Sequence, residues 1–140
     1  MIQNAIPEFM VIDDDPTNNL ICLRVIQLTI PGAVVHTFTN PEKVLEYIES
    51  AYTVNHVKTA VLLLDINMPL LTGWEVLAKI REFQGMVKER LQIFMLSSSV
   101  DLHDKEKARN EDIVSGYIIK PMSRDNCKAF LPRFQQDKYS

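Results

Sequence analysis

Several short apolar runs in this chain end in side chains that can bind a metal ion or handle a phosphoryl group. One run ends in Asp13-Asp14-Asp15, one in Asp65 followed by Asn67, one in Ser97-Ser98-Ser99 and one in Lys120-Pro121. Carboxylates that meet within a few ångströms repel one another, and a hard divalent cation such as Mg²⁺ relieves that repulsion. If the four run ends meet, the pattern predicts a Mg²⁺ site. There, a carboxylate can attack a phosphoryl group while the lysine and a hydroxyl stabilise its charge.

The elements that must position these side chains follow from an alternation of apolar runs with stretches of helical period. The runs lie at 9–12, 33–35, 61–64, 93–96 and 117–119, and most are continuous, as in strands buried on both faces. Helix start signals lie between them at Asp15 before Pro16, Asn40 before Pro41, Thr72 with Glu75, Asp101 and Ser123. This order predicts an α/β domain with a doubly wound, five-stranded parallel sheet and helices on both faces. Ligands of such sheets bind outside the carboxyl ends of the strands.

Two of the helices carry specific expectations. The stretch 102–112 offers little apolar face, so this helix should be loosely packed. The helix after Ser123 should end or kink near Leu131, because Pro132 cannot donate a hydrogen bond inside it.

Composition limits the class of protein. A chain of 140 residues with 46% hydrophobic residues predicts one domain, 1–140, with its core at about 8–134. A formal charge of -3 disfavours nucleic acid and anionic membranes as partners. No apolar stretch approaches the roughly 20 residues of a membrane span, so we expect a cytoplasmic protein. Scattered glycines exclude dinucleotide-binding and P-loop motifs.

Cysteines and histidines indicate no further site. Cys22 and Cys127 are too few and too far apart for a disulfide framework or a thiolate metal site, and we expect them to be reduced core residues. His36, His56 and His103 share no ligand spacing, and we expect them to be exposed or incidental.

The run ends resemble the motifs of a known family, the receiver domains of two-component response regulators, of the single-domain CheY-like kind. The matching stretches, in order, are Val11-Ile12-Asp13-Asp14, Leu64 to Pro69 with Gly73, Met95-Leu96-Ser97-Ser98, and Tyr117 to Pro121. Each alone is weak, but together they are highly specific. The resemblance implies a flavodoxin-like fold. Departures are small: Ser98 stands where the family often has alanine, and Asp15 is an additional acid.

For the metal, the resemblance implies that Asp14, Asp65 and the backbone carbonyl of Asn67 bind Mg²⁺ directly. Asp13 would orient the ion through water. Asp15 is more simply a helix N-cap and is not counted as a ligand.

For signalling, the resemblance implies that Asp65 is the phosphoacceptor and that Lys120 and the Ser97 hydroxyl hold the phosphoryl oxygens. Tyr117 would be the switch aromatic that follows Ser97, and the Lys120-Pro121 bond would be cis. The implied donor is a histidine kinase or a histidine phosphotransfer protein, and the implied output is contact with a downstream protein. Such a chain is mainly a switch that catalyses only its own phosphorylation and dephosphorylation.

Alternatives remain. Asp13-Asp14-Asp15-Pro16-Thr17 also fits the signature of haloacid-dehalogenase-type phosphatases with Asp13 as nucleophile. That family needs a further acidic pair after the lysine, and the stretch from Pro121 to Asp125 offers only one acid, at a helix start. A receiver-fold module that is never phosphorylated would lack a site residue, and none is missing. Ser98 or Ser99 could replace Ser97 if the strand register slips by one.

Overall fold

Strands and helices alternate along the chain in the computed structural model, which describes residues 6–52, 59–83, 89–98 and 102–130. The elements are β1 (Glu8–Ile12), α1 (Pro16–Thr29), β2 (Val35–Phe38), α2 (Pro41–Tyr52), β3 (Ala60–Asp65), α3 (Gly73–Arg81), β4 (Leu91–Ser97), α5 (Leu102–Asn110), β5 (Val114–Ile119) and α6 (Arg124–Lys128). The predicted α/β alternation is therefore confirmed.

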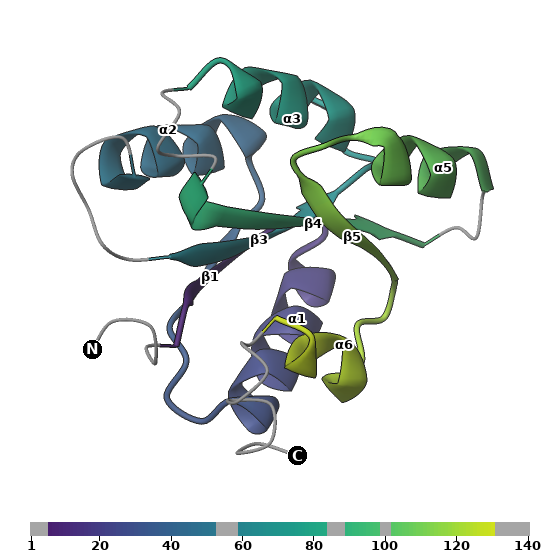
Figure 1. Cartoon of the computed structure of the whole chain (residues 1–140). Helices are drawn as coiled ribbons and strands as arrows, with labels where there is room; N and C mark the ends of the chain where they lie inside the picture. The colour runs from purple at the N-terminus through teal and green to yellow at the C-terminus, as the bar shows by residue number, and fades with distance from the viewer. Residues whose placement is uncertain (1–5, 53–58, 84–88, 99–101, 131–140) are drawn as a thin grey trace.

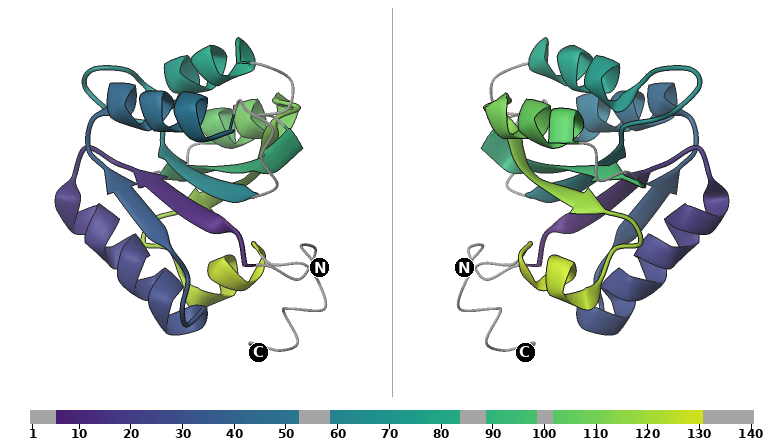
Figure 2. Two further views of the ribbon diagram at one scale, coloured as in Figure 1. Left: turned by 90° about the vertical axis from the view of Figure 1, so that its left-hand side faces the viewer. Right: turned by 90° about the vertical axis from the view of Figure 1, so that its right-hand side faces the viewer.

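The strands form one parallel sheet in the order β2-β1-β3-β4-β5. Helices α2, α3 and α5 lie on one side of the sheet, and α1 and α6 lie on the other (Figures 1 and 2). This is the doubly wound arrangement. In it, the carboxyl ends of β1, β3, β4 and β5 meet at one edge of the sheet.

Alternate residues of the central strands fill a core on each side. Met10 and Leu62 belong to the cluster that packs against α2 and α3, whereas Phe9 and Leu63 belong to the cluster that packs against α1 and α6. Because both faces are covered, β1 and β3 read as continuous apolar runs. The strand ends are thus held by a core on either side.

The second strand differs from its sequence prediction. The apolar run 33–35 predicts a strand there, but β2 begins at Val35 and pairs through Phe38 with β1. Its central residues, His36 and Thr37, are polar because β2 is an edge strand whose side chains stay partly exposed. The apolar run therefore indicates the residues just before the strand and its first residue, but not the polar residues in its middle.

The helices bear out most expectations. Helix α5 buries only Ala108, which confirms the small apolar face predicted for this stretch, while its loose packing stays a prediction. Cys22 and Cys127 are free and buried, as predicted. Helix α6 ends at Lys128, earlier than predicted, and Leu131 lies outside the described residues. No helix among the described residues is long and apolar enough to cross a membrane.

Candidate functional site

The register of the sheet brings the predicted residues to one edge. Asp13 directly follows β1, Asp65 ends β3, Ser97 ends β4 and Lys120 directly follows β5. These strands are neighbours, and the backbone N–H of Lys120 donates to the Ser97 carbonyl at 2.8 Å. Parallel pairing therefore places residues from four distant parts of the chain within reach of one another.

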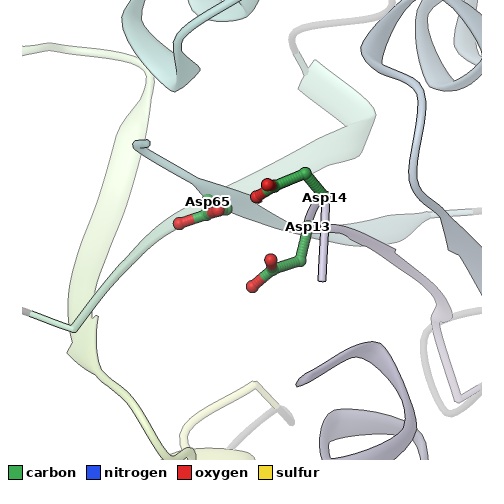
Figure 3. Close-up of side chains that lie close together, drawn as sticks. All are labelled: Asp13, Asp14 and Asp65. Carbon is green, nitrogen blue, oxygen red and sulfur yellow. The ribbon is translucent and has the colours of Figure 1, made fainter. Parts of the chain in front are cut away.

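Three carboxyl groups form the centre of the site. One oxygen from each of Asp13, Asp14 and Asp65 lies within 4.8 Å of the others, and the Asp14 carboxyl group points toward Asp65 (Figure 3). Asp13 and Asp65 are buried, with 1% and 2% of their surface exposed, whereas Asp14 is exposed. Three oxygen donors of this kind fit a hard divalent cation such as Mg²⁺.

The Lys120 ammonium bridges two of these carboxylates. Its Nζ atom lies 2.8 Å from Oδ2 of Asp13 and 3.1 Å from Oδ1 of Asp65. Burial acts to lower the pKa of Lys120, but its hydrogen bonds to the two carboxylates raise it above the usual value. Lys120 therefore carries its charge at neutral pH.

The two buried aspartates differ in protonation. Burial and the charge of Asp13 raise the pKa of Asp65 to about 6, although Lys120 acts in the opposite direction. Burial also acts to raise the pKa of Asp13, but hydrogen bonds from Lys120, the Asp15 N–H and Asn18 hold it below its usual value. Asp65 is thus the carboxyl group whose ionisation costs most, and the one that gains most from a nearby cation.

The β1–α1 loop fixes Asp13 from both sides. The backbone N–H of Asp15 donates to Oδ1 of Asp13 at 2.9 Å, and Asn18 Nδ2 donates to Oδ2 at 2.6 Å. The Asp15 side chain accepts from the Thr17 N–H at 2.9 Å, so Asp15 is the N-cap of α1, as predicted. The first turn of α1 therefore anchors the acid cluster.

The β3–α3 loop is tied to Asp65. The Asn67 N–H lies 3.4 Å from Oδ1 of Asp65, and the Gly73 N–H donates to the Ile66 carbonyl at 2.8 Å. A Cβ atom on Gly73 would lie 2.6 Å from the Asp65 carbonyl oxygen, so a side chain would not fit there. Thr72 and Glu75 cap α3 with reciprocal hydrogen bonds.

Two of the three consecutive serines lie within the described residues. Ser97 is the last residue of β4 and is fully buried, while Ser98 is exposed, and Ser99 lies outside the described residues, as does Asp101. Tyr117 pairs in register with Met95 of β4 and packs, half-buried, against the core. The Lys120-Pro121 peptide bond is cis. These positions are geometric facts, and the roles of Ser97 and Tyr117 stay predictions.

Sequence reasoning missed two asparagines next to the site, Asn18, whose bond to the Asp13 carboxylate is given above, and Asn19. Asn19 of α1 is buried and donates from Nδ2 to the carbonyls of Asp13 and Phe38, at 3.1 and 2.9 Å. Two adjacent asparagines near the start of a helix carry no family motif. Their low helix propensity was the only available signal.

His36 makes a contact that sequence reasoning did not anticipate. Its side chain is 38% exposed, and its Nε2 lies 3.0 Å from Oε2 of Glu8. Tyr47 and Tyr52 donate to Oε1 of the same carboxylate. This group lies at the amino end of β1, at the opposite end of the strand from the acid cluster. His103 is exposed and His56 lies outside the described residues.

Comparison with protein families and with curated proteins shows what this chain is similar to. The family model for the response regulator receiver domain matches residues 9–131. Among curated proteins, the chain is 28% identical over 127 residues to the sensor protein EvgS of Escherichia coli O157:H7, covering 91% of this chain and 10% of that protein. EvgS of Escherichia coli strain K12 is 27% identical over the same length. The chain thus spans about a tenth of the length of these curated relatives.

Solved structures share the fold. A two component response regulator from Cytophaga hutchinsonii superposes with a TM-score of 0.82 at 24% identity, covering 95% of this chain and 98% of that one. CheY4 of Vibrio cholerae gives 0.69 at 19% identity, covering 97% and 100%. The response regulator TrrA of Thermotoga maritima, in complex with Mg(2+)-BeF, gives 0.62 at 25% identity, covering 89% and 95%.

Proposed function

This chain belongs to the family of response regulator receiver domains of two-component signalling, and from that membership we propose that Asp65 is its phosphoacceptor. The supporting observation is the contact between Lys120 and Asp65 within a cluster of three carboxyl groups. All hydrogen bonds described for Asp65 end on Oδ1, so Oδ2 is the oxygen best placed to act as the nucleophile. We also propose that residues 1–140 act as one such domain.

Mg²⁺ is the proposed cofactor. Asp14, Asp65 and the carbonyl of Asn67 would bind it directly, and Asp13 would act through water. The cluster fits such an ion because its three carboxylates supply hard oxygen donors, and the solved structure of TrrA is in complex with Mg(2+)-BeF. When bound, the ion neutralises charge on the carboxylates and on the transferring phosphoryl oxygens.

Phosphoryl transfer requires one bond to form as another breaks. A carboxylate oxygen of Asp65 bonds to phosphorus while the bond from phosphorus to the donor's imidazole nitrogen breaks, and the electron pair of that bond stays on the imidazole. Lys120 moves its ammonium onto a phosphoryl oxygen, and the Ser97 hydroxyl donates to another. Water later attacks the phosphorus and releases the Asp65 carboxylate.

The donor is proposed to be a histidine kinase or a histidine phosphotransfer protein. Large apolar side chains are exposed around the edge of the sheet that carries the acids: Leu20 and Ile21 on α1, Leu70, Leu102 and Ile119. Exposed apolar side chains close to a polar centre can contribute to contact with a protein donor. Because a histidine kinase takes its phosphoryl group from ATP, we propose that the exchange takes place in the cytoplasm.

Output is proposed to run through α5 and β5. A cavity of about 320 Å³ is lined by residues of both elements, among them Lys105, Arg109 and Tyr117. Helix α5 is held by little buried apolar surface, so a small change in free energy can move it. Engagement of Ser97 and Lys120 by the phosphoryl group would draw Tyr117 inward and shift α5 toward a form that a downstream protein binds.

The phosphatase alternative is disfavoured by the surroundings of Asp13. Both of its carboxylate oxygens already accept hydrogen bonds, from Asp15, Asn18 and Lys120. A nucleophile held in this way would have to break those bonds before attacking phosphorus.

Intact mass spectrometry after incubation with acetyl phosphate tests the proposal. We expect one added phosphoryl group that requires Mg²⁺, is absent with chelator, and maps to Asp65. Asp65→Asn should remove it, and Asp15→Asn, which keeps the helix cap, should retain it. Phosphate on Asp13 with rapid turnover would instead indicate a phosphatase, and no modification of the wild type would indicate a module that is never phosphorylated.

A further inference from the structure

Asn19 ties together the ends of two strands beside the acid cluster. It lies in the second turn of α1 with only 4% of its surface exposed. Both hydrogens of its side-chain amide are used, one on the Asp13 carbonyl at 3.1 Å and one on the Phe38 carbonyl at 2.9 Å. The Phe38 carbonyl also accepts from the Asp13 N–H at 3.1 Å. The amide of Asn19 therefore continues the β1–β2 ladder beyond the last strand pair.

The bond to the Asp13 carbonyl acts on Asp14. That carbonyl belongs to the planar peptide unit that joins Asp13 to Asp14. A hydrogen bond that fixes the carbonyl fixes the plane, and with it the position of the Asp14 Cα atom and the direction of its side chain. Asp14 is exposed and projects from the loop, so the orientation of this peptide unit decides whether its carboxyl group meets the other two.

Asn19 lowers the stability of the packing between α1 and the sheet in two ways. Asparagine is a poor helix former, and Oδ1 of Asn19 is buried with no hydrogen-bond partner among the described residues. Buried polar atoms without partners are rare, because each loses its hydration without compensation. An apolar residue such as leucine would pack the same helix against the sheet without this cost. The amide is therefore better explained by what its Nδ2 atom does for the site.

We propose that Asn19 is a positioning residue, whose amide holds the Asp13–Asp14 peptide so that the Asp14 carboxyl group is preorganised to bind a divalent cation. The inference rests on the proposed Mg²⁺ site and deepens it. Groups that orient metal ligands through hydrogen bonds typically change metal affinity by about 10–100-fold when they are removed. Asn19 makes no contact with the cation itself.

The test is a titration of the unphosphorylated protein with Mg²⁺, followed by amide NMR shifts, in the wild type and in Asn19→Leu. We expect the Kd for Mg²⁺ to rise about tenfold in Asn19→Leu. The variant should stay folded, with a urea midpoint below that of the wild type, because the Asp13 carbonyl loses its donor. With acetyl phosphate, the Mg²⁺ concentration for half-maximal phosphorylation should rise by the same factor. The rate at saturating Mg²⁺ should stay within about twofold, because excess cation restores the Asp14 position.

Thr29→Val is the matched control, since Thr29 is a buried polar residue at the far end of the same helix, where Oγ1 donates to the Val25 carbonyl at 2.7 Å. It should change the urea midpoint without changing the Kd for Mg²⁺. Asn19→Ala, which removes the amide without adding bulk, should repeat the loss of affinity.

The outcomes separate the two proposals. If the wild type itself shows no Mg²⁺-dependent shifts, the proposed cation site is wrong. If the wild type binds and either folded Asn19 variant binds within twofold of it, the role of Asn19 is overturned. Loss of the folded state in both variants would overturn it as well, because the amide would then be holding the fold.

Discussion

The Lys120 Nζ atom lies 3.1 Å from Oδ1 of Asp65, so an ammonium at the end of β5 faces the carboxyl group at the end of β3. This contact does not fully offset burial and the charge of Asp13, since the pKa of Asp65 is raised to about 6. Without a bound cation, the site therefore carries more negative charge than its surroundings stabilise. That excess favours binding of a divalent cation, which makes the carboxylate available as a nucleophile.

Replacing Asp65 by Asn should stabilise the metal-free protein at neutral pH. The pKa of Asp65 is about 6 in the folded protein against an ordinary value of 3.8. The stabilising contribution of this group is therefore present below pH 3.8 and is lost as the pH rises through about 6. In urea titrations with chelator, Asp65→Asn should exceed the wild type by about 3 kcal/mol at pH 7.5, with the difference shrinking toward pH 4. A difference independent of pH would contradict this account.

Removing Lys120 should have the opposite effect. Lys120→Ala leaves Asp13 and Asp65 buried without their counterion, which should lower the free energy of unfolding by about 3 kcal/mol in chelator. Mg²⁺ should restore part of this loss. The variant should still accept a phosphoryl group on Asp65, but phosphorylation should no longer change amide exchange in α5. Equal exchange shifts in wild type and variant would show that Lys120 does not couple the site to that helix.

The pH dependence of Glu8 has the opposite sign to that of Asp65. Burial acts to raise the pKa of Glu8, but hydrogen bonds from Tyr52, Tyr47 and His36 hold it below 4.5. The stabilisation that Glu8 provides is therefore present above pH 4.5 and is lost as the pH falls through its lowered pKa. Glu8→Gln should lower stability at pH 7 by about 1–2 kcal/mol, and the gap should close in acid. The exposed Glu46→Gln is the control.

The strand ends could be predicted because a buried strand is an apolar run, and the first polar residue marks the point where burial stops. Asp13, Asp65, Ser97 and Lys120 each end or directly follow a strand, and parallel pairing then leaves little freedom in where they meet. The same reasoning failed at β2, where an edge position permits polar residues that no apolar run marks. Sequence pattern therefore predicts the covered parts of the sheet better than its margins.

Contacts between distant side chains were not predictable. His36 and Glu8 come together only because β1 and β2 pair in one register, and Asn19 reaches Phe38 only through the packing of α1 beside β2. No spacing in the chain encodes either contact. The positions that carry the family motifs could be predicted, whereas the residues that support them could not.

Gly73 should tolerate no side chain. A Cβ there would lie 2.6 Å from the Asp65 carbonyl oxygen and 2.9 Å from the Ile66 Cα atom, and neither backbone atom can move without shifting β3. Gly73→Ala should lower the free energy of unfolding by about 2–3 kcal/mol and slow phosphorylation of Asp65. Gly32→Ala is the comparison, because Gly32 has a φ of 87° but open space around it. It should cost only about 1 kcal/mol in thermal or urea unfolding and leave phosphorylation unchanged.

Trp74 should report the movement of α5. The Lys107 Nζ atom of α5 lies 4.8 Å from the centre of the Trp74 ring, and Trp74 is the single tryptophan of the chain. If activation moves α5, addition of Mg²⁺ with fluoroberyllate should move the Lys107 ammonium away from the Trp74 ring. The tryptophan emission should then change. Lys107→Gln should start from the altered emission and respond less, whereas Lys105→Gln, on the same helix, should respond like the wild type. An equal response from Lys107→Gln would mean that Trp74 senses Asp65 directly, through its neighbour Gly73, and that α5 keeps its position.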